Sequence, residues 1–292
     1  MNEAQVRALR EGAGALRLER GRLVVRGADR VSWLHNLTTQ DIKRLAPGRE
    51  GCFATMVTRI GKLVATLQAR VLADEIRIDT DRPRELREAM EKLIIIEDVQ
   101  LEEVTAKTSL VGVYGPMARE RLGLPDLPPW GIHGDALRVP VYGVDGYELW
   151  LPAGAKPNVD ATSVSPEALD VLRIEACHPK WGAELDETII PVEANLESIA
   201  VSYSKGCYIG QEIIQRIKTY SQAKQQLRRL RLKGEPLPSA GEKILREGAV
   251  VGRVTSAVRS LHLGPIALGF VGRDHAAEGT RVVAGSVEAV IG

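Results

Sequence analysis

The sequence predicts an α+β protein with two mixed lobes and a C-terminal all-β barrel. Before Gln226, the chain alternates between strand-like and helix-like hydrophobic patterns. From about Gln226 onward, short apolar runs alternate with turns that contain Gly or Pro, and no long helical pattern follows. At 292 residues and 44% hydrophobic content, the chain is long enough for two or three cores. We therefore expect lobes over 1–105 and 106–224, which can exchange segments, and a barrel over 225–292.

Alternating apolar residues predict the strands of the first lobe, at 23–26, 63–71 and 75–80. Two helices are expected beside them. Asp29 can cap a helix that runs through Leu37, since apolar residues recur there at helical spacing. Asp81 is the expected N-cap of a second helix over Arg84–Ile95, with Pro83 in its first turn. The first lobe is thus expected to pack helices on a small sheet.

The second lobe repeats this mixture of strands and helices. Its expected strands lie at 109–114, 137–141 and 147–151. A short helix is expected over 117–122, and Ser165 with Pro166 opens another that runs through Ala176. The expected barrel strands lie at 227–232, 249–258, 265–271, 282–284 and 287–291.

Composition excludes several classes of protein. The longest apolar run, around Ile94–Ile96, is far shorter than the roughly 18 residues that a membrane-spanning helix needs. A net charge of +1 excludes a globally basic nucleic-acid binder, although a local basic patch remains possible. We expect a cytoplasmic protein that makes no membrane contact.

The three cysteines are too few and too scattered for a disulfide framework, which indicates a reducing compartment. Cys177 stands next to His178, but no second Cys or His pair follows at a metal-ligand spacing. We interpret Cys177, and Cys52 beside Phe53, as packing residues. No intrinsic metal site is expected.

The segment Lys205–Glu212 (KGCYIGQE) is the strongest candidate for chemistry. Two glycines flank Cys207, and the isoleucines that follow share one helical face, so Cys207 is expected in a turn just before a helix. The helix dipole and the ammonium of Lys205 would both favour the thiolate form. A small buried cysteine in a tight turn is the alternative interpretation.

This octapeptide resembles the signature of the YgfZ family, folate-binding relatives of the glycine-cleavage T-protein. Further similarity lies in the segments 27–29, 34–42, 173–176, 182–187 and 191–196. The resemblance implies α+β folate-binding lobes around a central opening, closed by a C-terminal barrel. T-proteins carry an Asp pair after a Gly-Gly turn, whereas this chain has no acid over Gly61–Thr66. Aminomethyl transfer as in glycine cleavage is therefore disfavoured.

The resemblance implies a tetrahydrofolate-binding protein that assists assembly or repair of iron–sulfur clusters, including those of tRNA-thiolating radical enzymes. Cys207 would be the functional thiol, a transient cluster ligand or a nucleophile, with Lys205 keeping it ionised or binding an anion. One cysteine cannot hold a cluster alone, so a carrier or client protein must supply other ligands. Conventional enzymatic turnover is not expected. The residues expected at the folate are Glu175, Tyr208, Gln211, Glu212 and Arg216.

Two other functions remain open. The first is a folate-dependent one-carbon (aminomethyl or methyl) transferase or a demethylase. The second is a tRNA-modification factor that contacts RNA through a basic segment over 216–233, which contains no acid. Its seven basic residues are Arg216, Lys218, Lys224, Arg228, Arg229, Arg231 and Lys233. They could equally be solvated residues of a linker and a barrel edge.

Overall fold

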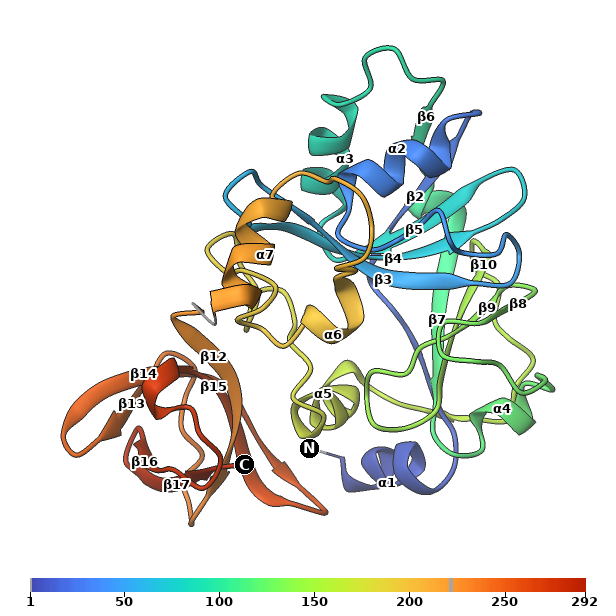
Figure 1. Ribbon diagram of the computed structural model, residues 1–292. Helices are drawn as coiled ribbons and strands as arrows, with labels where there is room; N and C mark the ends of the chain where they lie inside the picture. Colours follow the sequence, from blue (N-terminus) through green and yellow to red (C-terminus); the bar gives the residue numbers. More distant parts are fainter. Residues whose placement is uncertain (1, 221–222) are drawn as a thin grey trace.

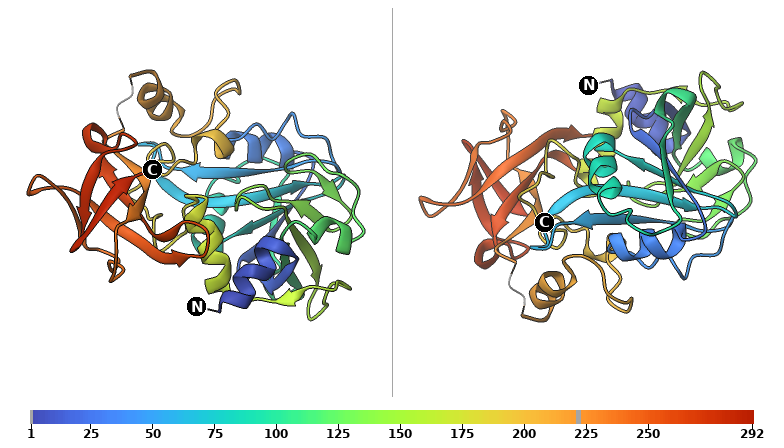
Figure 2. Two further views of the ribbon diagram at one scale, coloured as in Figure 1. Left: turned by 90° about the horizontal axis from the view of Figure 1, so that it is seen from below. Right: turned by 90° about the horizontal axis from the view of Figure 1, so that it is seen from above.

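The computed structural model describes residues 2–220 and 223–292 (Figure 1). Its strands form a five-stranded sheet, a six-stranded sheet and a closed six-stranded barrel. The barrel lies at one end of the molecule, beside the part that contains both sheets (Figure 2). The predicted α+β architecture with a C-terminal barrel is therefore confirmed.

The five-stranded sheet has the order β3-β4-β5-β2-β6. Its strands are β2 (Gly21–Arg26), β3 (Gly51–Val57), β4 (Leu63–Val71), β5 (Ile76–Thr80) and β6 (Gln100–Glu103). Helices α2 (Arg30–Leu37) and α3 (Pro83–Glu91) bury Trp33, Leu34, Leu86 and Met90 in one core with these strands. The sequence did not reveal β3 and β6. Arg82, not Asp81, is the N-cap of α3, because this helix begins at Pro83.

The six-stranded sheet has the order β11-β1-β7-β10-β9-β8. Its strands are β1 (Gly14–Arg17), β7 (Thr108–Tyr114), β8 (Ile132–His133), β9 (Ala136–Arg138), β10 (Gly146–Pro152) and β11 (Thr162–Ser163). Its helical elements are α1 (Glu3–Glu11), η1 (Thr105–Lys107), α4 (Ala118–Arg121) and α5 (Pro166–Glu175). Because β1 pairs with β7, Gly14–Arg17 join the second sheet, although we expected them in the lobe 1–105. Helix α1 packs beside α5 through Leu9 and Leu172.

Two helices, α6 (Glu197–Ala200) and α7 (Gln211–Tyr220), precede the barrel. The barrel strands and their short helix are β12 (Gln225–Leu232), β13 (Lys243–Arg246), β14 (Ala249–Ser260), β15 (Gly264–Gly272), η2 (Arg273–His275), β16 (Arg281–Ala284) and β17 (Val287–Ile291). One hydrophobic cluster joins Phe53 and Leu63 of the first sheet to Leu268 and Phe270 of the barrel. The barrel is therefore fixed to the lobes by a shared core.

That shared core yields a prediction about stability. Leu268→Ala removes a fully buried side chain and should lower the free energy of unfolding by about 2–5 kcal/mol. Val250→Ala, at a position 58% exposed in the same barrel, is the matched control and should change it by less than about 0.5 kcal/mol. Urea unfolding, followed by tryptophan fluorescence, measures both. Equal effects of the two variants would contradict the shared core.

Candidate functional site

A cavity of about 230 Å³ lies where the two sheets and α5 meet. Phe53 of β3, Thr66 and Gln68 of β4, and Leu169 of α5 contribute to its wall. The segment that joins β1 to β2 crosses it with Glu19 and Arg20. Its remaining lining residues are Leu16, Arg17, Leu18, Asp81, Tyr142, Pro166, Asp170, Arg173, His178, Pro179, Lys180 and Leu185.

Aromatic rings line one side of this cavity. The ring of His178 lies 6.0 Å from that of Phe53 and 5.5 Å from that of Tyr142, edge-on to both. Burial, together with the nearby charges of Arg173 and Arg20, lowers the pKa of His178 to about 3. His178 is therefore a neutral imidazole at physiological pH, and this wall can accept an uncharged planar ring.

The cavity floor is a buried network of charges. Arg20 pairs with Glu148 and, at 3.0 Å, with Asp79, which also pairs with Arg70. Tyr114 donates a hydrogen bond of 2.7 Å to Glu148. Burial alone would lower the pKa of Arg20, but the two carboxylates outweigh it and raise that pKa. Arg20 is consequently a fixed positive charge at the floor.

Asp81 is a cavity residue that the sequence analysis missed, because we interpreted it as a helix cap. It follows β5 and precedes Pro83, the first residue of α3. Its side chain is accessible to water, although protein surrounds it in the cavity. Burial raises the pKa of Asp81, and Asp79 adds to the rise, while Arg20 and Lys180 oppose it. A carboxyl group with a raised pKa that lines a cavity is a candidate functional residue.

Thr66, the position at which we noted a missing acid, also faces this cavity. Its hydroxyl oxygen accepts a hydrogen bond of 2.8 Å from the indole N–H of Trp181. Arg82 lies over the Trp181 ring, 4.8 Å from its centroid. Position 66 therefore helps to hold Trp181 and brings no negative charge to the cavity.

The signature segment lies apart from the cavity, and Lys205 anchors it. The buried Lys205 ammonium donates hydrogen bonds to the carbonyls of His35, Thr38 (2.6 Å) and Gln40 (3.0 Å), at the end of α2. These bonds use all three donors of the ammonium and satisfy the His35 and Thr38 carbonyls at the helix end, while the Gln40 carbonyl also accepts from the Ile42 N–H. Burial lowers the pKa of Lys205 to about 8. These contacts describe a clamp between two segments, whereas we expected the ammonium to act on the thiol or on an anion.

Two other signature residues fix the loop while Cys207 stays exposed. Tyr208 is buried in the core that joins the lobes to the barrel. Gly210 has a φ of +81°, and a Cβ there would lie 2.4 Å from the Thr58 carbonyl oxygen, so only glycine fits this close approach. Helix α7 begins at Gln211, so Cys207 precedes a helix as expected, but the turn lies at Ile209 and Gly210 and not at Cys207 itself. The thiol is presented to solvent on an anchored loop.

None of the five residues that we expected at the folate lines the central cavity. Glu175 instead pairs with Arg10 and accepts a hydrogen bond from Ser260, beside a neighbouring cavity of about 430 Å³. Tyr208 is buried in the loop, and Gln211, Glu212 and Arg216 lie on α7. Their roles in binding stay predictions. Arg173, in the family-like segment 173–176, does line the cavity, where it pairs with Glu184 at 2.7 Å.

Two of the seven cations of the basic segment 216–233 form ion pairs, and two others bind backbone carbonyls. Lys218 pairs with Glu197 and lies 3.5 Å from the centroid of the Tyr203 ring. Arg228 and Arg229 donate to backbone carbonyls, and Lys233 pairs with Glu288 at 3.6 Å. Ser221 and Gln222 lie outside the described residues. The two ion pairs offset part of the positive field that we expected to attract RNA, whereas the carbonyl partners leave the charges of Arg228 and Arg229 in place.

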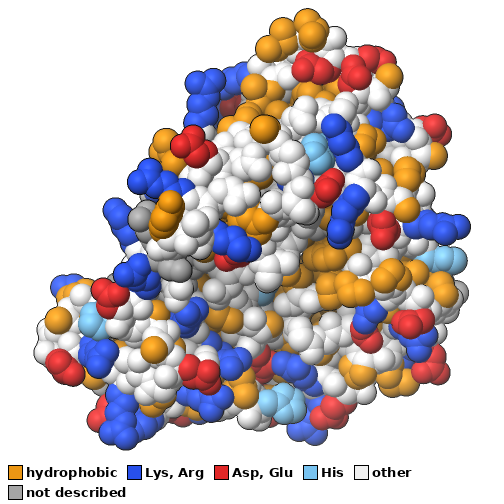
Figure 3. All heavy atoms as spheres, in the orientation of Figure 1, with side chains coloured by type: hydrophobic (Ala, Val, Ile, Leu, Met, Phe, Trp, Pro, Cys, Tyr) orange, Lys and Arg blue, Asp and Glu red, His pale blue; other side chains and the backbone are white. Residues whose placement is uncertain are grey.

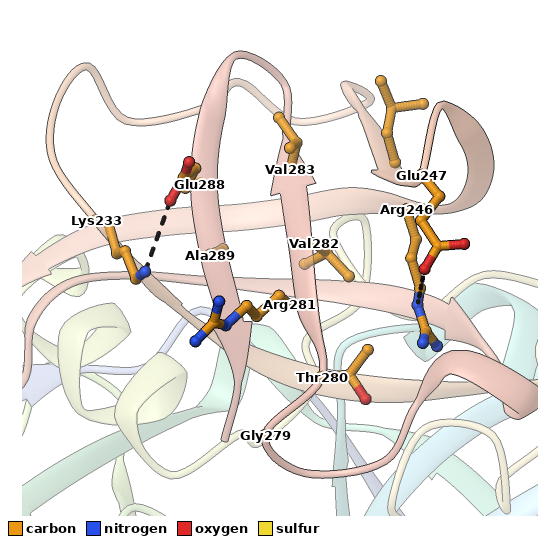
Figure 4. A pocket seen from close by; sticks show the side chains of 11 residues that line it. Lys233, Arg246, Glu247, Gly279, Thr280, Arg281, Val282, Val283, Glu288 and Ala289 are labelled. Atoms are coloured by element: carbon orange, nitrogen blue, oxygen red, sulfur yellow. Dashed lines mark ion pairs between the residues drawn. The ribbon is translucent and has the colours of Figure 1, made fainter.

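The barrel has an open pocket of about 580 Å³ between β13, β16 and β17. Figure 4 shows the Lys233–Glu288 and Arg246–Glu247 ion pairs in its wall. Two lysine or arginine side chains and two glutamates in this wall therefore form ion pairs with each other. Of the residues that we predicted to be functional, one lines this pocket, Lys233 of the basic segment.

Apolar side chains gather at the top of the molecule in the view of Figure 3, over the loop that joins α3 to β6. Ile95 and Ile96 in this loop are 80% and 92% exposed.

Within the described part of the chain, no helix combines the length and apolar character needed to cross a bilayer. Nor do three potential metal-ligating His, Cys, Asp or Glu side chains converge among residues 2–220 and 223–292.

The other two cysteines differ from Cys207 in their surroundings. Cys52 is buried in β3, and burial raises its pKa to about 12. Burial also raises the pKa of Cys177, whose sulfur lies 3.6 Å from the Asn195 amide nitrogen. Both thiols are therefore held in the protonated, unreactive form.

Comparisons with known proteins support a T-protein-like architecture. Residues 225–288 match the family described as "Glycine cleavage T-protein C-terminal barrel domain". The aminomethyltransferase T of Bartonella henselae has the same fold, with a TM-score of 0.85 and 21% identity, and the match covers 99% of this chain and 87% of that one. The fold is thus that of a T-protein.

Sequence relatives extend along most of the chain. An Arabidopsis thaliana protein named "Putative transferase", chloroplastic, is 29% identical over 91% of this chain. The chain spans 66% of that plant protein's length, slightly under two thirds. The aminomethyltransferase of Geobacillus kaustophilus is also 29% identical, over 90% of this chain and 79% of its own length.

The Lys205 clamp predicts a stability loss. Lys205→Met should lower the free energy of unfolding by at least about 2 kcal/mol, since it leaves the His35 and Thr38 carbonyls without the donor that Lys205 supplies. Lys218→Met, which removes a half-exposed charge, is the matched control and should cost less than about 1 kcal/mol. Urea unfolding measures both. A Lys205→Met protein as stable as the control would rule out the clamp.

The pKa of Asp81 predicts a pH-dependent gain in stability on its replacement. Because its folded pKa is raised, the native state retains a proton that the unfolded chain has released, so stability falls as pH rises through this window. Asp81→Asn should therefore raise the free energy of unfolding at neutral pH, by less than about 1 kcal/mol because cavity water screens the charge. The gain should shrink toward acid pH. Urea unfolding at neutral and acid pH tests this, and a loss at neutral pH would refute it.

Proposed function

We propose that this protein binds tetrahydrofolate in the central cavity. The observation that carries the proposal is a cavity that combines aromatic walls with a carboxylate, Asp81, that is free of ion pairs among the described residues. A pterin is a planar ring with N–H donors along one edge, so it needs both an aromatic wall and an acceptor. The aminomethyltransferase relatives support the same ligand class.

The size of the cavity suits one ring system. Its volume of about 230 Å³ falls below the roughly 300–1,000 Å³ of sites that enclose whole drug-sized ligands. The rest of a folate would extend to solvent past Arg17 and Lys180, which are 58% and 48% exposed. Both face anionic side chains only in surface pairs, which are weak, so they remain able to attract the glutamate tail.

One-carbon transfer is the first candidate use of the bound folate, and the named relatives support it most directly. A reduced folate supplies the chemistry of carrying a one-carbon unit on its ring nitrogens. The residues of this chain would hold the ring, exclude part of the surrounding water and fix Arg20 at the cavity floor. The Thr66 hydroxyl, committed to Trp181, counts against the proton handling expected of a glycine-cleavage T-protein.

Support of iron–sulfur cluster assembly or repair, as in the YgfZ family, is the second candidate. The exposed Cys207 favours it, because thiolates bind iron–sulfur clusters and this loop is anchored at Lys205 and Tyr208. The cluster would be cargo shared with a client or carrier protein, since one thiol leaves most ligand positions to others.

Calorimetry with tetrahydrofolate tests the binding proposal. The wild-type protein should bind with a measurable Kd, and Cys207→Ser should bind equally well because Cys207 does not line the cavity. Undetectable binding to the wild type at millimolar ligand would overturn the folate proposal.

Activity assays of the same variant separate the two candidate uses. If the thiol serves cluster assembly, Cys207→Ser should abolish rescue of cluster-enzyme activity in a strain that lacks the protein. Ser204→Ala, on the same exposed stretch, is the matched control and should rescue fully. If transfer is the function, wild type and Cys207→Ser should convert tetrahydrofolate and an aminomethyl donor to methylenetetrahydrofolate at equal rates, with release of ammonia. Full rescue by Cys207→Ser would contradict the cluster role.

A further inference from the structure

We infer that Asp81 is the residue that recognises the N–H edge of a heteroaromatic ring in the central cavity. This inference rests on the proposed folate binding and assigns one residue to it. Its basis is the distribution of charge around the cavity, in which one carboxylate has no protein partner among the described residues.

The other two carboxylates that line the cavity each have a protein partner, Glu19 in a weak surface pair and Asp170 in two contacts. Glu19 lies 3.2 Å from Arg17. Asp170 accepts from Arg173 at 2.9 Å and from Lys180 at 3.1 Å. Asp81 has neither a hydrogen bond nor an ion pair within residues 2–220 and 223–292, so both of its oxygens remain available to a ligand.

The sheet holds Asp81 in a defined position. Strands β4 and β5 pair antiparallel, with Gln68 opposite Asp79. Continuing this register by two residues places Asp81 opposite Thr66, and residues opposite one another on adjacent antiparallel strands project to the same face. A bond of 2.7 Å from the Thr80 hydroxyl to the Thr66 carbonyl keeps the two strands together beyond their last ladder pair. Pro83 then limits the backbone on the other side.

The surroundings determine the kind of ligand. The nearby positive charge of Arg20 is committed to Asp79 and Glu148, so it cannot neutralise Asp81 fully. The aromatic wall of Phe53, Tyr142 and His178 favours a flat ring. A carboxylate pairs best with two adjacent N–H donors, because each oxygen then accepts one bond. The 2-amino group and the neighbouring ring N–H of a pterin provide this pair.

The test is calorimetry of wild type, Asp81→Asn and Asp74→Asn with 5-formyltetrahydrofolate. Asp81→Asn keeps the shape of the side chain but replaces one acceptor oxygen by a donor, and it should weaken binding at least about tenfold. Asp74, an exposed acid in the turn between β4 and β5, is the matched control because it undergoes the same loss of charge. Asp74→Asn should bind as the wild type does. Thermal unfolding of each variant verifies that it is folded.

A second ligand determines which edge Asp81 recognises. An analogue that carries methyl in place of the 2-amino group should bind the wild type at least about tenfold more weakly, since one donor is lost. It should bind Asp81→Asn about as well as the parent ligand does, because the interaction is already broken. An equal penalty in both proteins would overturn the assignment.

The outcomes also separate this inference from the proposed function. If the wild type binds no folate, the proposed function fails and the assignment falls with it. If the wild type binds and folded Asp81→Asn has the same Kd, the assignment alone is wrong.

Discussion

The buried charge network of Arg20, Arg70, Asp79 and Glu148 is the interaction on which the site depends. Arg70 and Asp79 belong to the five-stranded sheet, while Glu148 belongs to the six-stranded sheet, and Arg20 bridges the two. Removing one member would leave a buried charge without compensation, which costs far more than the loss of a surface pair. The network therefore holds the two sheets together at the cavity floor and fixes the shape of the space above it.

The signature KGCYIGQE combines anchoring residues with one free thiol. Lys205 ties the loop to the end of α2, Tyr208 enters the shared core, and Gly210 permits close contact with the Thr58 carbonyl. These residues order the loop in the free protein. The loop therefore loses less conformational entropy when it binds a partner than an unanchored loop would. These anchors hold Cys207 in a defined position although its side chain is exposed. This arrangement suits a group that must meet another macromolecule.

The cavity and the thiol are separate features of one molecule. Asp81, Arg20 and the aromatic wall surround a space suited to a small planar ligand, whereas Cys207 faces solvent on the loop before α7. A ligand in the cavity would therefore leave the thiol accessible to another molecule. The same separation explains why T-protein architecture by itself does not decide between one-carbon transfer and cluster assembly.

Local sequence patterns determined the α+β class, the barrel, most strands and the helix that follows Cys207, because hydrophobic periodicity and Pro or Gly positions act over a few residues. They also singled out Lys205 as important but not its partners, which lie about 165–170 residues away along the chain. Asp81 resembled a helix cap in the sequence. Only the tertiary structure placed Asp81 in the cavity. Likewise, only the tertiary structure showed that Glu175 binds Arg10 and Ser260. Long-range pairing of strands and the burial of charge decide such contacts, and neither is encoded in the spacing of neighbouring residues.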